Sequence, residues 1–306
     1  MKLMENNFIP ISDDFEDIIF IEGEQNAKYP YSNSMIVGTF LIDTGVGSKN
    51  VRKIIRKYDI DKVLLTHWHE DHINGNRHFK GKNIQFLSHE QDKPLIEDIE
   101  RMYNAYGVKD TPLESDFKQL IQVLRMKNIE VSKTFQDKQI LHLSDLPHKI
   151  QVFHTPGHTA GHCSFYEMNS KIAFLGDIDL TNFSFYGSLD ADLITFENSI
   201  EKLKDLDMEF ACTGHKGVII GNKEIKAQLE NYEKIIKKRD KRILNHLSES
   251  NPINPTDLKG KNLIYKKYSQ FENYELLAEK IMIGKHFEKF LQNKVIEKIN
   301  NGYVLK

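Results

Sequence analysis

The sequence has few cysteines and no long apolar run, and each shortage excludes a class of protein. Two cysteines, Cys163 and Cys212, are too few for a disulfide-stapled scaffold in a chain of 306 residues. Both lie in strand-like segments, where a small buried thiol is the usual state. No stretch approaches the roughly 20 apolar residues that a membrane-spanning helix requires. We therefore expect no membrane partner.

We also expect no secretory signal at the start of the sequence. Met1-Lys2-Leu3-Met4 continues directly into Glu5-Asn6-Asn7, with no apolar region behind it. Together with the scarcity of cysteine, this start predicts a cytoplasmic location. The residues are nevertheless 40% apolar, which is enough for a sizeable core, and the length suits one large domain with an appended module.

Histidine and aspartate, by contrast, are concentrated behind short apolar runs. The densest group follows residues 63–65 and places three imidazoles and a carboxylate within six positions: His67, His69, Asp71 and His72. A strand followed by a turn points such side chains toward one centre. Imidazole nitrogen and carboxylate oxygen suit zinc, iron or manganese. The spacing therefore predicts a metal site with two ligand sets side by side.

Three further strand-like runs end in glycine and a ligand-type residue. The segment 150–153 leads to Gly157-His158, residues 174–175 lead to Gly176-Asp177, and residues 211–213 lead to Gly214-His215. Glycine beside a ligand lets the backbone approach a metal without an intervening side chain. Together with the first group, four strand ends carry ligand-type residues, which indicates a two-metal site.

In order and spacing these motifs resemble the metallo-β-lactamase-fold superfamily of metallo-hydrolases, over roughly residues 30–220. Leu41-Ile42-Asp43-Thr44-Gly45 matches the superfamily's first motif, in which the aspartate supports a ligand and binds no metal itself. The resemblance implies an α/β (α+β) fold, an αββα sandwich, and two divalent metal ions, with zinc ahead of iron or manganese. It implies one ion held by His67, His69 and His158, another held by Asp71, His72 and His215, and Asp177 bridging both.

The expected chemistry is hydrolysis by a hydroxide that bridges the two metals. Two divalent ions about 3.5–4 Å apart lower the pKa of a shared water toward neutrality. We expect Asp71 to orient the hydroxide and take its proton. Asp43 is expected to accept a hydrogen bond from a ligand imidazole and so fix its tautomer. Tyr186, in the aromatic loop after Asp177, resembles a tyrosine that donates to the substrate oxygen in similar lactonases, with simple packing as the equal alternative.

The first hypothesis for function is therefore a metal-dependent hydrolase of a small-molecule carbonyl ester, such as a thioester, a lactone or a small ester. The alternatives are a phosphodiesterase or endoribonuclease, and a mononuclear iron persulfide dioxygenase. Similar dioxygenases leave part of the second metal set unused, whereas this sequence retains Asp71, His72 and His215. Lactam hydrolysis is disfavoured, because the related lactamases either place a cysteine near the position of Asp177 or lack a bridging carboxylate.

The C-terminal part of the sequence differs in charge from the rest. Residues 223–306 carry 18 Lys and Arg against 11 Asp and Glu, a net charge of +7, whereas residues 1–222 carry a net charge of −9. We predict a catalytic domain over 1–222 and a small, mostly helical domain over 223–306. Helical patterns run over 225–247 and 274–299, and Asn301 to Leu305 suggest a turn and a strand, which together resemble a small winged-helix domain. Such a domain predicts either RNA binding or a packing or homodimerisation module that walls the active site.

Overall fold

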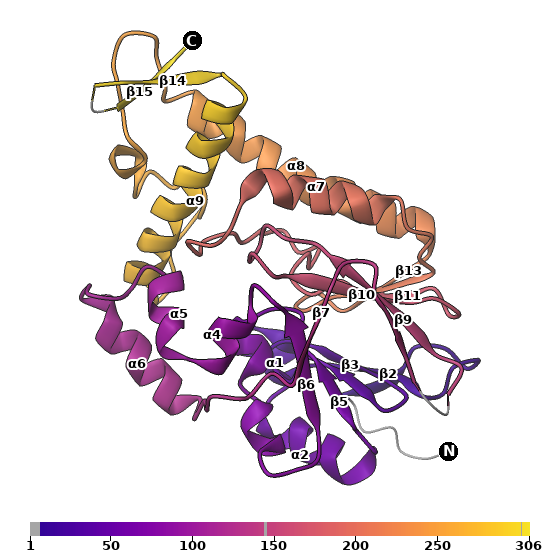
Figure 1. The fold of residues 1–306 in the computed structure, drawn as a ribbon. Coiled ribbons are helices and arrows are strands. Elements are labelled where there is room, and N and C mark those ends of the chain that lie inside the picture. Colours follow the sequence, from indigo (N-terminus) through magenta and orange to yellow (C-terminus); the bar gives the residue numbers. More distant parts are fainter. Residues whose placement is uncertain (1–6, 144–145, 301) are drawn as a thin grey trace.

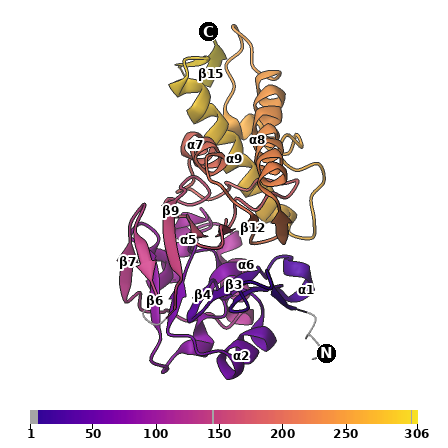
Figure 2. The same ribbon diagram turned by 90° about the vertical axis from the view of Figure 1, so that its right-hand side faces the viewer.

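Two β-sheets packed face to face form the centre of the molecule, and helices cover both outer faces (Figures 1 and 2). The structure, a computed structural model, describes residues 7–143, 146–300 and 302–306. The expectation of no secretory signal depended on residues 1–6, and part of the predicted C-terminal turn depended on residue 301. These residues lie outside the described residues. The layer order confirms the predicted αββα sandwich.

The first sheet combines an antiparallel half and a parallel half. Strands β1 to β4 pair antiparallel, and β4 to β7 pair parallel, because helical connections return the chain to the same edge. Side chains alternate between two apolar environments, with Ile36 facing the helices and Met35 and Val37 facing the other sheet. The strands, in spatial order, are β1 (Phe8–Pro10), β2 (Ile18–Ile21), β3 (Ser34–Val37), β4 (Phe40–Ile42), β5 (Lys62–Leu64), β6 (Gln85–His89) and β7 (Lys133–Phe135).

The second sheet packs on the first through a cluster of buried apolar side chains. Phe135 of β7 meets Phe165 across this layer, with ring centroids 5.4 Å apart in an edge-to-face arrangement. The pairing is antiparallel except between the two strands joined by helix α7 (Leu193–Lys204). In spatial order the strands are β13 (Val218–Ile220), β12 (Phe210–Cys212), β11 (Ile172–Phe174), β10 (Cys163–Glu167), β9 (Lys149–His154) and β8 (Ile140–His142).

Helices cover the outer face of each sheet and complete the two outer layers. The first sheet packs against a group of helices drawn from the first half of the chain, and the second sheet packs against α7 and the C-terminal helices. The remaining elements are α1 (Glu24–Ala27), α2 (Ser48–Lys57), α3 (Glu70–Ile73), η1 (Asn76–Phe79), α4 (Lys93–Glu97), α5 (Glu100–Ala105), α6 (Leu113–Val123), α8 (Asn222–Leu244), η2 (Pro255–Leu258), α9 (Glu272–Gln292), β14 (Ile296–Ile299) and β15 (Gly302–Leu305).

The C-terminal segment begins with α8, which lies along the outer face of the second sheet. Ile225, Leu229 and Tyr232 of α8 are buried in the same apolar cluster as residues of β11 and β12. One hydrophobic core thus extends across the predicted boundary at residue 222, and the division into two domains stays a prediction. The predicted helix over 274–299 is too long, because Lys294 adopts a left-handed backbone (φ 58°) that ends α9 before the β14–β15 hairpin.

Two sequence expectations can be compared directly with the described residues. Cys163 and Cys212 are both free and buried, as predicted. Within residues 7–143, 146–300 and 302–306, no helix combines the length and the apolar character that crossing a membrane requires.

A buried carboxylate closes the turn between β10 and β11. Glu167 accepts hydrogen bonds from the Ser170 amide and hydroxyl, both 2.6 Å, and from the Lys149 amide at 3.0 Å, and His148 Nδ1 lies 3.5 Å away. Burial alone would raise the pKa of Glu167, but the neighbouring His148 ring and the hydrogen bonds from Ser170 and Lys149 lower it from 4.5 to about 2.

The Glu167→Gln variant is expected to lose stability at neutral pH and to match the wild type in strong acid. A lowered carboxyl pKa stabilises the fold only while the group is ionised, so its contribution is complete above pH 4.5 and disappears as the pH falls toward 2. We expect the free energy of unfolding to drop by about 2–3 kcal/mol near pH 6. Urea unfolding over a pH series measures this difference. The exposed Glu209 supplies the control variant, Glu209→Gln, and a gap that stayed constant with pH would contradict the assignment.

Candidate metal centre

The seven predicted ligand side chains meet at one edge of the two sheets. They come from segments far apart in the sequence, but each segment follows the carboxyl end of a strand at this edge. Six of these side chains are buried, and His215 is partly buried. His67 and His69 follow β5, Asp71 and His72 lie on α3, and His158, Asp177 and His215 follow β9, β11 and β12.

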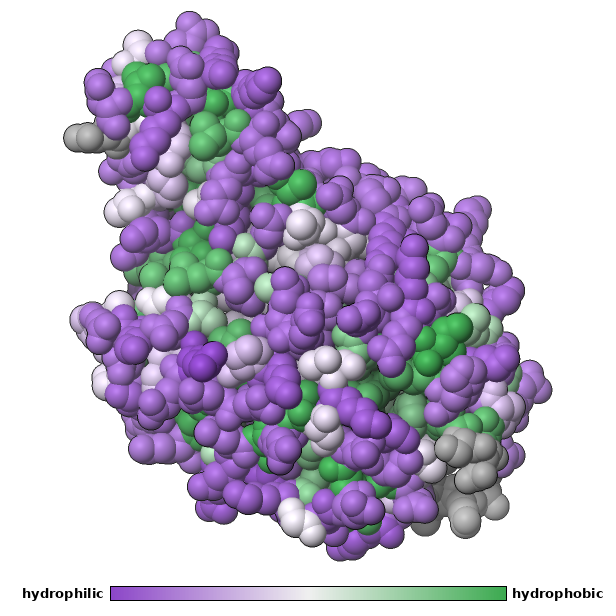
Figure 3. Space-filling model, viewed as in Figure 1, coloured by the Kyte–Doolittle hydropathy of each residue, from purple (hydrophilic) through white to green (hydrophobic). Residues whose placement is uncertain are grey.

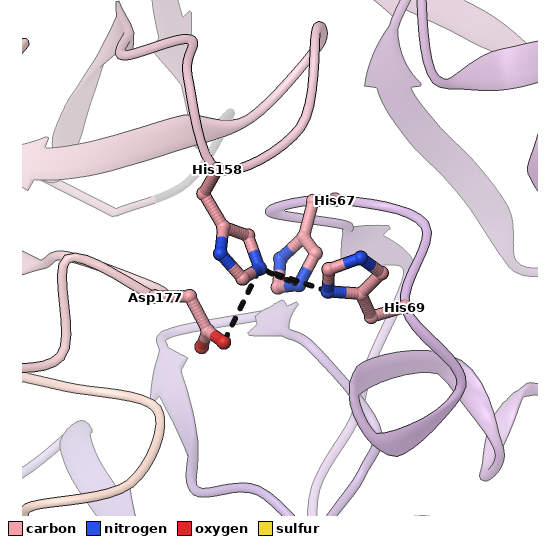
Figure 4. Close-up of side chains that lie close together, drawn as sticks. All are labelled: His67, His69, His158 and Asp177. Atoms are coloured by element: carbon pink, nitrogen blue, oxygen red, sulfur yellow. Dashed lines mark hydrogen bonds and ion pairs between the residues drawn. The ribbon is translucent and has the colours of Figure 1, made fainter. Parts of the chain in front are cut away.

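The first cluster consists of three imidazoles and one carboxylate whose ligand atoms all lie within 4.8 Å of one another (Figure 4). His158 Nε2 occupies its middle, 3.1 Å from His67 Nε2 and 2.8 Å from His69 Nδ1. The Asp177 Oδ2 atom lies 3.3 Å from the same nitrogen. Three nitrogens and one oxygen therefore face a common point.

The second cluster shares the Asp177 carboxylate with the first. Asp177 Oδ1 lies 2.9 Å from His72 Nε2 and 3.5 Å from His215 Nε2. His215 Nε2 is also 3.4 Å from His72 Nε2 and 3.4 Å from Asp71 Oδ2. One carboxylate oxygen thus faces each cluster, which is the arrangement that a bridging ligand requires.

Hydrogen bonds on the outer side of the rings decide which nitrogen faces the clusters. A carboxylate or carbonyl oxygen can only accept, so a ring nitrogen beside it must carry the hydrogen and the other nitrogen turns a lone pair inward. This holds for Nδ1 of three rings: His72 donates to Asp43 Oδ2 (2.7 Å), His158 to the Phe185 carbonyl (2.8 Å) and His215 to the Ala27 carbonyl (2.7 Å).

Asp43 supports both clusters from a single buried position. Besides His72, its carboxylate accepts the Thr66 amide at 2.8 Å and the Thr66 hydroxyl at 2.7 Å. Because the Thr66 hydroxyl donates to Asp43, its oxygen accepts from His67 Nδ1, 2.9 Å away. The structure confirms the predicted hydrogen bond between Asp43 and a ligand-type imidazole.

The donor set fits metal ions. With Nδ1 of His67 and His158 protonated, two lone pairs would face each other across 3.1 Å unless a cation lay between them. Asp177 Oδ1 is buried without a hydrogen-bond partner among the described residues. Burial lowers the pKa of His67 and His69, which keeps both rings in the neutral form that binds metal. Imidazole and carboxylate donors suit zinc, iron or manganese, and the individual ligand roles stay a prediction.

Glycine permits the backbone to pass close to the clusters, as the sequence suggested. A Cβ atom on Gly214 would lie 2.6 Å from Asp177 Oδ1 and 2.9 Å from a ring carbon of His72. A Cβ atom on Gly45 would lie 1.6 Å from the Asp71 carbonyl oxygen. Any larger residue at either position would displace a ligand-type side chain or its backbone.

Tyr186 lies away from the position that its predicted role requires. Its side chain is fully buried, and its hydroxyl is 2.8 Å from His286 Nε2 and 3.1 Å from an Arg239 guanidinium nitrogen. His286 Nδ1 donates to Asp240 at 2.6 Å, so His286 Nε2 accepts the Tyr186 hydrogen. Burial raises the pKa of Tyr186 to about 12. With its hydrogen already committed, the hydroxyl has none to donate to a substrate.

Two buried acids beside the clusters were not identified from the sequence. Glu70 accepts hydrogen bonds from the hydroxyls of Tyr29 at 2.6 Å and Tyr106 at 2.5 Å. Asp92 accepts hydrogen bonds from the Trp68 and Gly161 amides and from the Thr159 hydroxyl. It therefore connects the loop that carries His69 to the loop that carries His158. Glu70 was visible inside the histidine motif, whereas no local pattern marks Asp92.

Aromatic rings line the side of the centre next to His69. Tyr106 stacks on the His69 ring with centroids 5.3 Å apart, and Phe185 lies 6.0 Å from His69 and 5.9 Å from His158. Tyr274, near the start of α9, packs edge-on against Tyr106 at 5.9 Å. The aromatic wall (Tyr106, Phe185 and Tyr274) therefore combines residues from three separate parts of the chain.

Comparison with protein families and curated proteins identifies related sequences. The model of the metallo-beta-lactamase superfamily matches residues 29–215. The atrochrysone carboxyl ACP thioesterase of Passalora fulva is 25% identical over 276 residues, covering 85% of this chain and 71% of the thioesterase. The hydroxyacylglutathione hydrolase GloC of Haemophilus influenzae is 30% identical over 148 residues, covering 45% of this chain and 59% of the hydrolase.

The fold also resembles solved structures over nearly the whole chain. A metallo-beta-lactamase family protein from Thermus thermophilus superimposes with a TM-score of 0.66 at 18% sequence identity. The match covers 98% of this chain and 97% of that protein. At this identity the likeness concerns the fold, including the C-terminal helices.

The Asp43→Asn variant is expected to bind zinc about 10–100-fold more weakly than the wild type, because an amide cannot accept all three hydrogen bonds that support His72 and Thr66. Competition with a chromophoric chelator measures the affinity, and circular dichroism verifies the fold. The control is Asp61→Asn, because Asp61 is exposed before β5 and its carboxylate pairs with Lys62. Wild-type affinity in a folded Asp43→Asn protein would show that Asp43 does not support the centre.

Proposed function

Because the chain belongs to the metallo-beta-lactamase superfamily and is a metal-dependent hydrolase, we propose that it hydrolyses a thioester or a related carbonyl ester with an apolar acyl group. The observation that carries this proposal is the Asp177 carboxylate, which turns one oxygen toward each of two complete ligand sets. Such a bridged pair suits hydrolysis by two metal ions. A mononuclear dioxygenase would leave part of the second set, Asp71, His72 and His215, unused.

The roles proposed for the side chains follow from their positions. His67, His69 and His158 would hold one ion, Asp71, His72 and His215 would hold the other, and Asp177 would contribute to both sets. When bound, two divalent ions lower the pKa of a shared water and polarise a carbonyl oxygen. Asp71, at the edge of the second cluster, orients the attacking water and takes its proton. The phenol-bound Glu70 fixes the start of α3 and with it the direction of Asp71.

The aromatic wall supports an apolar acyl group. Phe185 lies beside both His69 and His158, Tyr106 stacks on His69, and Tyr274 packs against Tyr106. An acyl group bound on this side of the centre would therefore meet an aromatic environment. On the outside of the molecule, Figure 3 shows apolar surface where α9 meets the region of α5 and α6. Apolar side chains therefore lie beside the ligand-type residues, and apolar surface lies where α9 meets α5 and α6.

The names of two similar proteins also favour thioester chemistry. One is a thioesterase whose name refers to a carrier-protein substrate, and the other is a hydroxyacylglutathione hydrolase. An acyl glutathione is itself a thioester. Both names support the proposed class of bond, and a substrate assay has to identify the acyl group.

A phosphodiester in RNA is the second candidate substrate. The observation in its favour is a row of exposed lysines on one side of α8, namely Lys234, Lys237, Lys238 and Lys241, which would attract a phosphate backbone. Homodimerisation through the C-terminal segment and a cytoplasmic location likewise stay predictions.

A substrate panel with ligand variants tests the proposal. Zinc-loaded protein is assayed with an aromatic acyl-pantetheine thioester, an acyl glutathione and an end-labelled single-stranded RNA. We expect thioester cleavage, and we expect His158→Ala and Asp177→Asn to lower kcat/KM by more than about 100-fold, since removing a ligand should exceed the loss of a supporting partner. The matched controls are His246→Ala, at an exposed position after α8, and Asp61→Asn.

Each outcome of this panel has a defined meaning. Near-normal turnover in either ligand variant would refute the assigned centre. RNA cleavage that is lost in Asp177→Asn, without thioester cleavage, would establish the second candidate. One iron per chain with oxygen consumption on a persulfide would replace the hydrolytic proposal with the dioxygenase.

A further inference from the structure

Side chains from α8 and α9 fasten the loop that follows Asp177, residues 178–190, at several points. These contacts begin at Asp177 itself and continue to the end of the loop. Tyr232 of α8 donates to the Asp177 carbonyl (3.1 Å), Arg239 of α8 donates to the Ser184 carbonyl, His286 of α9 accepts from Tyr186 (2.8 Å), and Lys285 of α9 donates to the Leu189 carbonyl (3.1 Å).

Arg239 is the most deeply buried of these cationic anchors, with 1% of its surface exposed. Its guanidinium donates to the Ser184 carbonyl and to the Tyr186 hydroxyl, and it lies 4.7 Å from the centre of the Phe183 ring. A buried guanidinium is tolerated only where its donors are satisfied. The loop supplies two acceptors for one guanidinium nitrogen and an aromatic ring beside it, so Arg239 and the loop fix each other's position.

A second chain of contacts begins at the same Tyr186 hydroxyl. Tyr186 donates to His286 Nε2, His286 Nδ1 donates to Asp240 Oδ1 at 2.6 Å, and Lys289 donates to Asp240 Oδ2 at 2.7 Å. Lys289 also pairs with Glu197 of α7 at 2.6 Å. The Tyr186 ring is thus anchored to three helices, although its hydroxyl has no hydrogen left for a substrate.

Phe185 lies between the two fastened residues, and its carbonyl accepts the hydrogen of His158 Nδ1 at 2.8 Å. This contact keeps the hydrogen on the outer nitrogen and directs His158 Nε2 toward His67 and His69. Displacement of the Ser184–Tyr186 backbone would therefore alter the ring that occupies the middle of the first cluster.

We infer that Arg239 is a positioning residue for the metal centre: by holding Ser184 and Tyr186, it fixes the Phe185 carbonyl that orients His158. The inference rests on the proposed role of His158 as a metal ligand. It also gives the C-terminal helices a purpose at the centre that does not depend on nucleic acid.

Zinc affinity of the full-length protein tests the inference. We expect Arg239→Met to bind zinc about tenfold or more weakly in chelator competition, the usual effect of removing an outer support of a metal ligand, and Arg239→Lys to retain part of the affinity. Arg242→Met is the matched control, because Arg242 lies one turn further along α8 and donates to the Leu263 carbonyl, outside this loop. The His158 Nδ1–H signal in NMR spectra of the zinc-loaded protein should be sharp in the wild type and exchange-broadened in Arg239→Met.

Wild-type affinity in a folded Arg239→Met protein would overturn the inference, as would an equal loss in Arg242→Met. If Arg239→Met does not fold, Arg239→Lys and Tyr186→Phe decide: weaker zinc binding in either supports the inference, and unchanged binding in both overturns it. A wild-type protein that binds no zinc, iron or manganese would refute the proposed function itself, which separates the two failures.

Discussion

The Asp177 carboxylate, buried between two groups of imidazoles, is the interaction on which the rest of the centre depends. A charge in this position is unfavourable unless cations or hydrogen-bond donors surround it. Nε2 of His158 faces one oxygen and Nε2 of His72 faces the other. Because each ring carries its hydrogen on Nδ1, both nitrogens turn a lone pair toward the carboxylate and supply no donor to it. The Asp177 amide is held as well, because it donates to His162 Nε2 at 3.0 Å. Metal ions between these groups would complete the balance of charge.

A second layer of contacts determines the tautomer of each ring. Asp43, in a left-handed backbone conformation (φ 58°), accepts from His72 and from Thr66, and Thr66 in turn accepts from His67. The carbonyl groups of Ala27 and Phe185 accept the Nδ1 hydrogens of His215 and His158, respectively. The acceptors come from loops that are themselves held by distant segments. The orientation of the imidazole rings therefore depends on the packing of the whole fold.

The meeting of the seven ligand-type side chains could be predicted from the sequence, because they stand directly behind strands and several stand beside glycines, a local pattern. The αββα layers followed from the same pattern through resemblance. The supports of the centre could not be predicted in this way. Arg239 contacts Tyr186 across 53 positions of sequence, and Tyr186 contacts His286 across 100. Such contacts exist only after α8 and α9 pack on the second sheet. The local sequence therefore left a substrate contact and simple packing as equal alternatives for Tyr186, whereas the folded chain gives its hydroxyl to His286.

The C-terminal helices consequently contact both the loop beside the metal-binding clusters and the aromatic wall. α8 contributes Arg239 and Tyr232, which hold the loop beside the ligands, and α9 contributes Tyr274, which forms part of the aromatic wall. A change that moved α9 would alter the wall through Tyr274 and the ligand support through His286, on the same helix. Substrate preference and metal binding should therefore vary together when the α8–α9 packing changes. A module that served only to attract RNA would give no reason for these buried contacts, since exposed lysines alone would suffice for attraction.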